Sequence, residues 1–159
     1  MHFICPKSFE PSSATHEAVL DLSCCPAHLI RKSVILQPLS ALDSIPALVH
    51  IKKLETAIGR ERNAVDVHLD SARVPRMISR VHSYLVYSHH QWKVRDNRSV
   101  NGVFVNDRKV HEAALRDGDI VVFGGGGNRP IGAIFEQRES EFKYEFRSSH
   151  WNPLLLSAE

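Results

Sequence analysis

Residues 78–106 read ISRVHSYLVYSHHQWKVRDNRSVNGVFVN and contain three short β-like stretches separated by polar loops. The apolar stretch 84–87 and the stretch 92–95, in which apolar and basic residues alternate, flank a short polar loop at 88–91, which predicts two strands joined as a hairpin. After a second polar loop, residues 102–105 predict another strand. This part of the chain therefore indicates antiparallel β-structure with its polar side chains concentrated in the loops.

The same alternation of short apolar runs and polar turns continues on both sides of this stretch. Short apolar runs separated by turn residues recur about every 8–12 residues, and no long segment has helical periodicity. The pattern predicts an all-β sandwich or barrel of about eleven strands. The further strands are expected at 34–36, 48–51, 56–58, 65–69, 120–123, 133–135 and 142–146. The core aromatic side chains are expected to be Trp92, Phe104, Phe123 and Phe135.

Length and composition indicate one domain with tails. The chain has 159 residues, and all eight glycines follow residue 58, whereas most prolines precede residue 47. We expect a flexible N-terminal tail over 1–32, a domain over 33–147 and a C-terminal tail over 148–159. Residues 13–22 have the pattern of a short helix, for which a nascent helix without function is the simpler interpretation.

Charge and cysteine content exclude several classes of protein. Twenty basic and eighteen acidic residues give a net charge of +2, too balanced for nucleic-acid binding driven by net charge. No apolar run approaches the ~20 residues that span a bilayer, and the N-terminus lacks the apolar segment of a secretory signal. The three cysteines, Cys5, Cys24 and Cys25, cannot form a four-cysteine zinc site and favour a reducing compartment.

Three motifs suggest chemistry but have simpler interpretations. The glycine run 124–127 lacks the Lys-Ser/Thr ending of a phosphate-binding P-loop, so we interpret it as a flexible loop between strands. His89 and His90 have no further ligand at metal-binding spacing, so neither a metal nor a cofactor is expected. Ser79 and His82 resemble a nucleophile and base, but no orienting acid accompanies them, and we do not expect an enzyme.

A more informative group of polar residues lies at predicted strand ends. Arg60, Ser79, Arg80 and Asn101 fall in loops, and loops at one end of a sandwich meet in space. Two guanidinium groups and a hydroxyl form a compact site for a tetrahedral dianion. An asparagine amide offers both donors and an acceptor, which suits binding of a peptide backbone.

These residues belong to a longer pattern that resembles the forkhead-associated (FHA) domain. The resemblance covers residues 33–147 and implies an eleven-stranded β-sandwich of the SMAD/FHA type. It also implies a non-enzymatic module that binds phosphothreonine peptides through the loops at one end. The fragments that carry it, in order, are Gly59-Arg60, Ser79-Arg80-x-His82, Ser99-x-Asn101-Gly102-x-x-x-Asn106 and Leu115-x-x-Gly118-Asp119.

The resemblance implies a role for each binding residue. Arg60 resembles the arginine that contacts the phosphate or the adjacent peptide backbone, and Ser79 resembles the serine whose hydroxyl bonds a phosphate oxygen. Arg80 stands where the family often places a basic or amide group on the phosphate. Asn101 resembles the asparagine that bonds the peptide main chain. Arg98 is expected to face residues after the phosphothreonine, although a purely solvated arginine is an equal alternative.

Other positions are expected to support the site. Gly59 and Gly102 would allow close backbone turns, His82 would brace the loops from inside, and Asn106 would form a turn after its strand. Val100 is the departure from the family pattern, because many members have threonine there and use its hydroxyl to hold the phosphopeptide. An apolar residue at this position is similar to the FHA domains of RING-type ubiquitin ligases, although three cysteines cannot supply a RING here.

The resemblance implies a signalling adaptor whose partners are phosphothreonine-containing proteins, with no direct contact to nucleic acid or membrane. By analogy with the family we expect nuclear or nucleocytoplasmic localisation and a role such as the DNA damage response. The alternative is a phosphate-independent interaction or scaffold domain that uses a lateral sheet face, for example edge residues between Glu136 and Phe146. The oligomeric state stays open.

Overall fold

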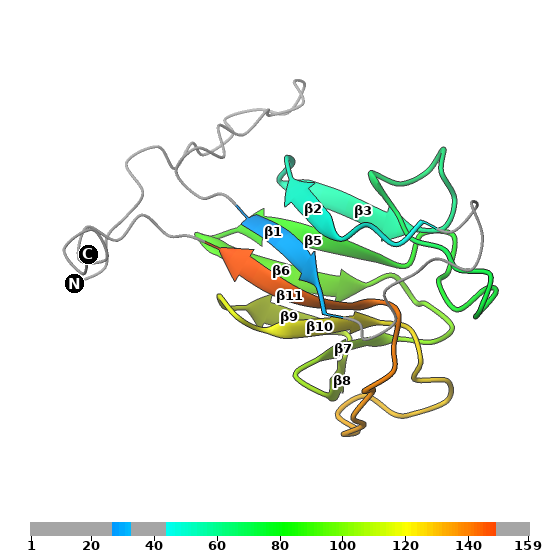
Figure 1. Cartoon of the computed structure of the whole chain (residues 1–159). Coiled ribbons are helices and arrows are strands. Elements are labelled where there is room, and N and C mark those ends of the chain that lie inside the picture. Colours follow the sequence, from blue (N-terminus) through cyan, green and yellow to red (C-terminus); the bar gives the residue numbers. More distant parts are fainter. Residues whose placement is uncertain (1–26, 33–43, 149–159) are drawn as a thin grey trace.

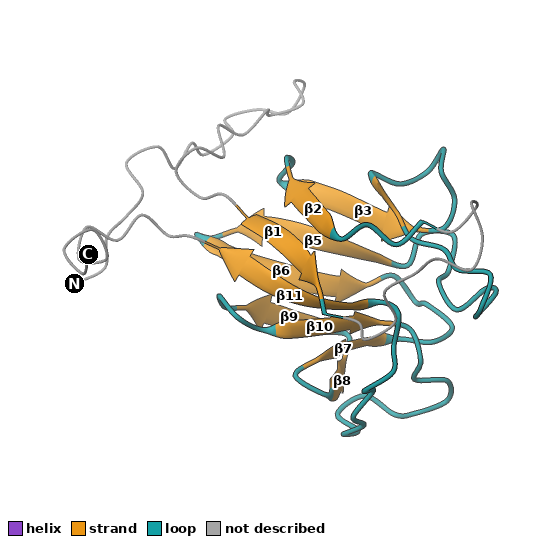
Figure 2. Cartoon of the chain, in the orientation of Figure 1, coloured by secondary structure: helices purple, strands orange, loops and turns teal. Residues whose placement is uncertain are grey.

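Eleven β-strands in two sheets make up the described part of the chain, residues 27–32 and 44–148 of the computed structural model (Figure 1). Within these residues there is no helix, as the colouring of Figure 2 shows, and hence none long and apolar enough to cross a membrane. The predicted eleven-stranded β-sandwich is confirmed. The strands are β1 (Ala27–Arg31), β2 (Leu48–Ile51), β3 (Glu55–Gly59), β4 (Val67–His68), β5 (Ser83–Ser88), β6 (Gln91–Asp96), β7 (Val103–Val105), β8 (Arg108–Val110), β9 (Glu112–Leu115), β10 (Ile120–Phe123) and β11 (Lys143–Ser148).

The two sheets pack against each other through alternating apolar side chains. One sheet has the order β2-β1-β11-β10-β7-β8 and the other the order β4-β3-β5-β6-β9. Trp92 of β6 is fully buried, and its ring lies 5.1 Å from that of Tyr87 on β5 and 6.2 Å from that of Phe146 on β11. Because β6 and β11 belong to different sheets, Trp92 joins the two layers of the core.

The hairpin predicted around residues 88–91 is present. Ser88 and Gln91 form the last cross-strand pair of β5 and β6, so the loop consists of His89 and His90 alone. Both histidines have positive φ, 52° and 61°, as a two-residue turn between right-twisted strands requires.

Three strands escaped prediction. β8 and β9 are short and lie at the sheet edges. β8 has a single apolar residue, and the apolar run of β9 contains two alanines, which have low β-propensity. β1 lies within the segment predicted as N-terminal tail, yet it pairs with β11 on one side and β2 on the other. Its apolar residues Ala27 and Leu29 are buried.

The strand expected at 133–135 is absent, which corrects that prediction. Ile134 forms only an isolated bridge with Arg108, and Phe135 is half-buried. The Phe135 ring lies 6.4 Å from that of Phe104, with the Arg129 guanidinium 3.7 Å from its centre. Phe135 therefore covers the outer side of β7 instead of joining the core between the sheets. Trp92 and Phe123 belong to that core as expected, whereas Phe104 is fully buried on the outer side of β7, next to Phe135.

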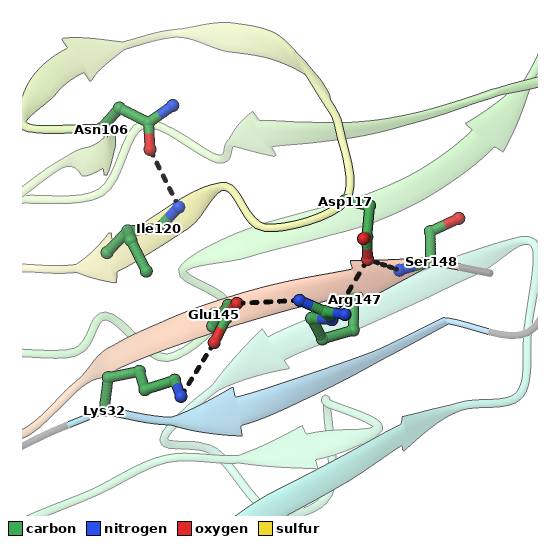
Figure 3. Close-up of polar contacts among 7 residues, drawn as sticks. All are labelled: Lys32, Asn106, Asp117, Ile120, Glu145, Arg147 and Ser148. Atoms are coloured by element: carbon green, nitrogen blue, oxygen red, sulfur yellow. Dashed lines mark hydrogen bonds and ion pairs between the residues drawn. The ribbon is translucent and has the colours of Figure 1, made fainter. Parts of the chain in front are cut away.

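Polar contacts secure the outer side of β11, where an ion-pair chain runs from Lys32 through Glu145 and Arg147 to Asp117 (Figure 3). The backbone N–H of Ser148 also donates to the Asp117 carboxylate at 3.0 Å. The short helix expected at 13–22, the strand expected at 34–36, the three cysteines and residues 149–159 lie outside the described residues.

Candidate functional site

Four loops gather at one end of the sandwich, on the right in Figure 1. They are residues 60–66 after β3, 69–82 after β4, 97–102 after β6 and 124–142 after β10. All the predicted binding residues lie in these loops, and hydrogen bonds between the loops hold them together. The structure thus brings into one region residues spread over about forty positions of the sequence.

Arg60 lies directly beside Ser79 and Arg80. Its backbone N–H donates to the Ser79 carbonyl at 3.2 Å, and the N–H of Glu61 donates to the Arg80 carbonyl at 3.1 Å. Gly59 permits this approach, because a Cβ at that position would lie 2.1 Å from the Arg80 oxygen. The close turn expected at Gly59 thus has a steric cause, the packing of one loop backbone against another.

The Arg60 side chain is incompletely satisfied. Its Nε atom is buried and has no hydrogen-bond partner among the described residues. Arg80 and Arg98 are exposed, and within the described part of the chain none of the three arginines forms an ion pair. Arginines elsewhere do, for example Arg147 with Asp117 at 3.2 Å. Guanidinium groups without acidic partners leave positive charge available to an anion.

The Ser79 hydroxyl is oriented by the neighbouring loop. Its Oγ accepts a hydrogen bond from the backbone N–H of Val100 at 3.2 Å. Since the oxygen is the acceptor in that bond, the hydroxyl proton stays available for donation to a ligand oxygen. Val100 itself is 75% exposed, so its side chain stands in solvent at the rim of the site.

The His82 side chain lies between two loops and contacts the backbone of each. Its fully buried ring accepts the Ser79 backbone N–H through Nδ1 at 3.0 Å and contacts the Gly102 carbonyl through Nε2 at 2.8 Å. A carbonyl only accepts, so Nε2 carries the ring proton. Burial lowers the pKa of His82, while the hydrogen bond to Gly102 and the Asp96 charge partly oppose that shift.

The same contacts distinguish this arrangement from a catalytic serine and base. Nδ1 of His82 receives the backbone N–H of Ser79, not its hydroxyl, and Nε2 is held by Gly102. The imidazole therefore has no free nitrogen with which to accept the Ser79 hydroxyl proton. Nucleophile activation by His82 would need a different arrangement.

Asn101 connects two other loops. Its Nδ2 donates to the Met77 carbonyl at 3.0 Å, and its own carbonyl accepts the N–H of Gly126 at 2.8 Å. The preceding turn is closed by Ser99, whose hydroxyl donates to Asp96 and accepts the Gly102 N–H at 2.9 Å. Asn101 is thereby held with its Oδ1 unbonded among the described residues.

The glycine run and Met77 form part of the site, which sequence reasoning missed. Besides Gly126, Gly124 donates its N–H to the Gly102 carbonyl at 2.8 Å, and the N–H of Gly125 points at the Met77 sulfur at 2.9 Å. A Cβ at Gly126 would lie 2.5 Å from the Phe104 ring. The run is indeed a loop after β10, but these contacts show why glycine is required there. Consecutive glycines beside a strand were the available signal for such close backbone approach.

Asn106 forms the expected turn, but at the far end of β7 from Gly102. With φ angles of 48° and 68°, Asn106 and Asp107 join β7 to β8. The Asn106 Oδ1 accepts the N–H of Ile120 at 3.0 Å, as Figure 3 shows, and its Nδ2 donates to Asp119. Asn106 thus connects the β7–β8 turn to the turn before β10, at the end of the sandwich opposite the binding loops. It does not contact the other predicted site residues.

The lateral edge suggested for a phosphate-independent interaction is not an edge. β11, which includes residues 143–146, pairs with β1 and β10 on its two sides. Its backbone groups are therefore engaged within the sheet, and the part of the suggestion that relied on an exposed strand edge there is wrong.

The loops of this β-sandwich present arginines without acidic partners among the described residues, a serine hydroxyl and an asparagine amide. Together these groups can bind an anion. Residues 56–124 match the sequence model of the FHA domain. The predicted resemblance to this domain is therefore confirmed over that segment, which contains every predicted site residue.

Known proteins share this region. The ABC transporter ATP-binding/permease protein Rv1747 of Mycobacterium tuberculosis is 46% identical over 52 residues, which cover 32% of this chain and 6% of that protein. The E3 ubiquitin-protein ligase RNF8 of Mus musculus is 33% identical over 105 residues, 63% of this chain and 20% of the ligase. The chain thus matches a fifth or less of the length of these relatives.

Solved structures share the fold. Mycobacterium tuberculosis EmbR, solved in complex with a low-affinity phosphopeptide, superposes with a TM-score of 0.52 at 22% identity, covering 80% of this chain and 25% of EmbR. Yeast Pml1p superposes with a TM-score of 0.54 at 14% identity, covering 79% and 83% of the two chains. At these identities the likeness establishes the sandwich fold.

Proposed function

We propose that this chain is a phosphothreonine-peptide recognition module that acts as a signalling adaptor. The observation that carries the proposal is the meeting of Arg60, Ser79 and Arg80 at one end of the sandwich. Two guanidinium groups without acidic partners and a hydroxyl with a free proton stand on adjoining loops. A phosphate monoester carries about −1.5 to −2 charge at pH 7 and three acceptor oxygens, which match these donors.

Asn101 complements the phosphate site. Its backbone and Nδ2 are fixed by neighbouring loops, so its unbonded Oδ1 can accept a main-chain N–H of the peptide. We propose that Arg98 and Val100, both exposed on the same loop, contact residues that follow the phosphothreonine. A threonine γ-methyl buried against these loops would make affinity for phosphothreonine a few-fold higher than for phosphoserine, since a buried methylene contributes about 0.8 kcal/mol.

The comparisons support this function and suggest its setting. EmbR, whose fold this chain shares, was solved with a phosphopeptide, and RNF8 is a ubiquitin ligase. We accordingly propose phosphorylated proteins as partners, with recognition and not catalysis as the contribution of this domain. By analogy with the FHA family, we propose nuclear or nucleocytoplasmic localisation and a role in signalling such as the DNA damage response. Neither nucleic acid nor membrane is proposed as a direct partner.

We propose that the recognition module extends slightly beyond the expected 33–147. Strand β1, from Ala27, pairs with β2 and β11, and β11 ends at Ser148. A fragment that begins at residue 33 would remove a paired strand from the first sheet. Binding experiments should therefore use the full chain.

Fluorescence polarisation with a degenerate phosphothreonine peptide library tests the function. Matched phosphoserine and unphosphorylated libraries are measured beside it, against the wild type, Arg60→Ala and Arg116→Ala. Arg116 is a suitable control because it is exposed in the turn before β10, at the opposite end of the sandwich. We expect binding of phosphothreonine peptides by the wild type and by Arg116→Ala, and its loss in a folded Arg60→Ala. A folded wild type without phosphate-dependent binding would overturn the proposal.

A further inference from the structure

His68 is a half-buried histidine beside the site that the family pattern does not include. It is the second residue of the short strand β4, where Val67 and Leu69 on either side point into the core. The alternation turns His68 away from the core and toward the loop that follows β3. There its Nε2 lies 3.0 Å from the backbone carbonyl oxygen of Arg60.

Two hydrogen bonds therefore hold the backbone of Arg60, one on each side of its Cα. Its N–H donates to the Ser79 carbonyl at 3.2 Å, and its carbonyl accepts from His68. The first bond sets Arg60 against the loop that carries the serine. The second sets it against β4. The peptide unit that carries the Arg60 carbonyl is also held by the Glu61 N–H, which donates to the Arg80 carbonyl at 3.1 Å. Removing the His68 bond therefore leaves this unit with one of its two hydrogen bonds, which loosens the backbone from which the guanidinium extends.

The position of His68 is itself fixed from both sides. Gly59 and His68 are direct partners in the parallel pairing of β3 and β4, and the N–H of Leu69 donates to the Gly59 carbonyl at 2.8 Å. On the other side the Ser44 hydroxyl donates to the His68 carbonyl at 2.9 Å. Because the His68 backbone is held on both sides, its ring offers the Arg60 carbonyl a hydrogen-bond donor at a fixed position.

Among the described residues, the only hydrogen-bond partner of the His68 ring is the backbone carbonyl of Arg60. Since Nε2 faces a carbonyl, Nε2 carries the proton, and Nδ1 is buried without a hydrogen-bond partner there. A buried unsatisfied nitrogen costs stability, which an apolar side chain at this position would avoid. The Nε of Arg60 is buried and unsatisfied as well. Each such group in a folded protein calls for an explanation, and two of them here belong to residues joined by one hydrogen bond.

We propose that His68 is a positioning residue that sets the phosphate affinity of the site through Arg60. The inference rests on the proposed function and adds to it a residue without direct contact to the ligand. One hydrogen bond of this kind changes the dissociation constant about three- to ten-fold.

A double-mutant cycle tests the proposal. Dissociation constants for a phosphothreonine peptide are measured for the wild type, His68→Leu, Arg60→Ala and the double variant. We expect His68→Leu to weaken binding about three- to ten-fold alone and to have no further effect once Arg60 is alanine. His68→Gln, whose amide can donate from nearly the same place as Nε2, should restore most of the affinity. An equal loss in both backgrounds, or no loss at all, would overturn the proposal.

Controls separate positioning from general destabilisation. His28, also half-buried but on the opposite sheet, provides the matched variant His28→Ala, which should leave the affinity unchanged. NMR of the free protein gives a readout that does not depend on peptide binding. It should show Nε2 of His68 protonated and, in His68→Leu, amide shifts concentrated at Arg60 and Glu61. Shifts elsewhere would overturn the inference, whereas an intact wild type that binds no phosphopeptide would overturn the proposed function instead.

Discussion

The backbone N–H of Val100 donates to the hydroxyl oxygen of Ser79 at 3.2 Å, across 21 residues of sequence. The bond makes the loop after β6 orient the hydroxyl that stands beside Arg60 and Arg80. It depends on the backbone at position 100 and not on the side chain. The residue that departs most clearly from the family pattern thus keeps a contact that any residue except proline could make.

Val100→Thr should strengthen phosphopeptide binding by a few-fold. The side chain is 75% exposed, so the change buries nothing, and a threonine hydroxyl there adds one donor beside the Ser79 hydroxyl. Stability should change by less than about 0.5 kcal/mol, because the position is on the surface. Peptide titration and urea unfolding measure the two effects. Val100→Ser, which adds the hydroxyl without the methyl, is the control, and weaker binding by both variants would contradict the expectation.

His82 should make the folded state sensitive to acid. Burial lowers the pKa of its ring below the ordinary value of 6.5, so the unfolded chain takes up a proton at a higher pH than the folded chain does. Its contribution to stability is therefore complete above pH 6.5 and is lost as the pH falls from there toward the lowered folded pKa. The loss cannot exceed about 1.4 kcal/mol per pH unit.

Urea unfolding between pH 8 and pH 5 measures this dependence. The wild type should lose stability below pH 6.5 more steeply than His82→Gln, while the exposed control His111→Gln should follow the wild type. NMR titration of the His82 ring in the intact protein provides a second measure that needs no variant. Parallel curves together with an ordinary ring titration would show that burial does not suppress protonation.

Gly59→Ala should destabilise the protein and disrupt the site together. The new Cβ would lie 2.1 Å from the Arg80 carbonyl oxygen, so the loop carrying Ser79 and Arg80 must shift. We expect a loss of about 3 kcal/mol or more, at or above the usual range for overpacking. Gly127→Ala is the matched control, because nothing lies within 4 Å of its Cβ and only its positive φ of 47° makes it costly, by about 1 kcal/mol. Thermal unfolding ranks the two, and equal losses would rule out the steric explanation.

Asn106→Ala should lower stability without altering phosphopeptide affinity. The change removes the bonds to Asp119 and Ile120 and places alanine at a φ of 48°, for a combined cost of about 1–3 kcal/mol. Since this turn lies at the opposite end of β7 from Gly102, the dissociation constant should stay within two-fold. Asn106→Gly relieves the backbone strain alone and should recover part of the stability. A large loss of affinity in a folded variant would show that the far turn controls the binding loops.

The strands that could be predicted from sequence are those marked by a short local pattern of apolar residues. The strands around Leu85, Trp92 and Phe123 were predictable because their apolar residues repeat within a few positions. Prediction failed for the edge strands β8 and β9, and for β1, whose burial depends on partners far along the chain. The 133–135 segment looked like a strand because Phe135 is apolar, although that ring covers the outside of β7.

The sequence by itself determined the sandwich class, the family and the residue types at the loop end, because these depend on local periodicity and on short motifs. Only the tertiary structure decided how the loops hold one another. In the folded chain, Nε2 of His68 lies beside the Arg60 carbonyl, Nδ1 of His82 accepts the Ser79 backbone N–H, and Asn106 bonds to Ile120 away from the site. Each of these contacts joins a side chain to a backbone group, and backbone groups are the same in every residue. The backbone group that a side chain reaches is therefore set by the packing of the sheets and loops and leaves no signature in the order of the side chains.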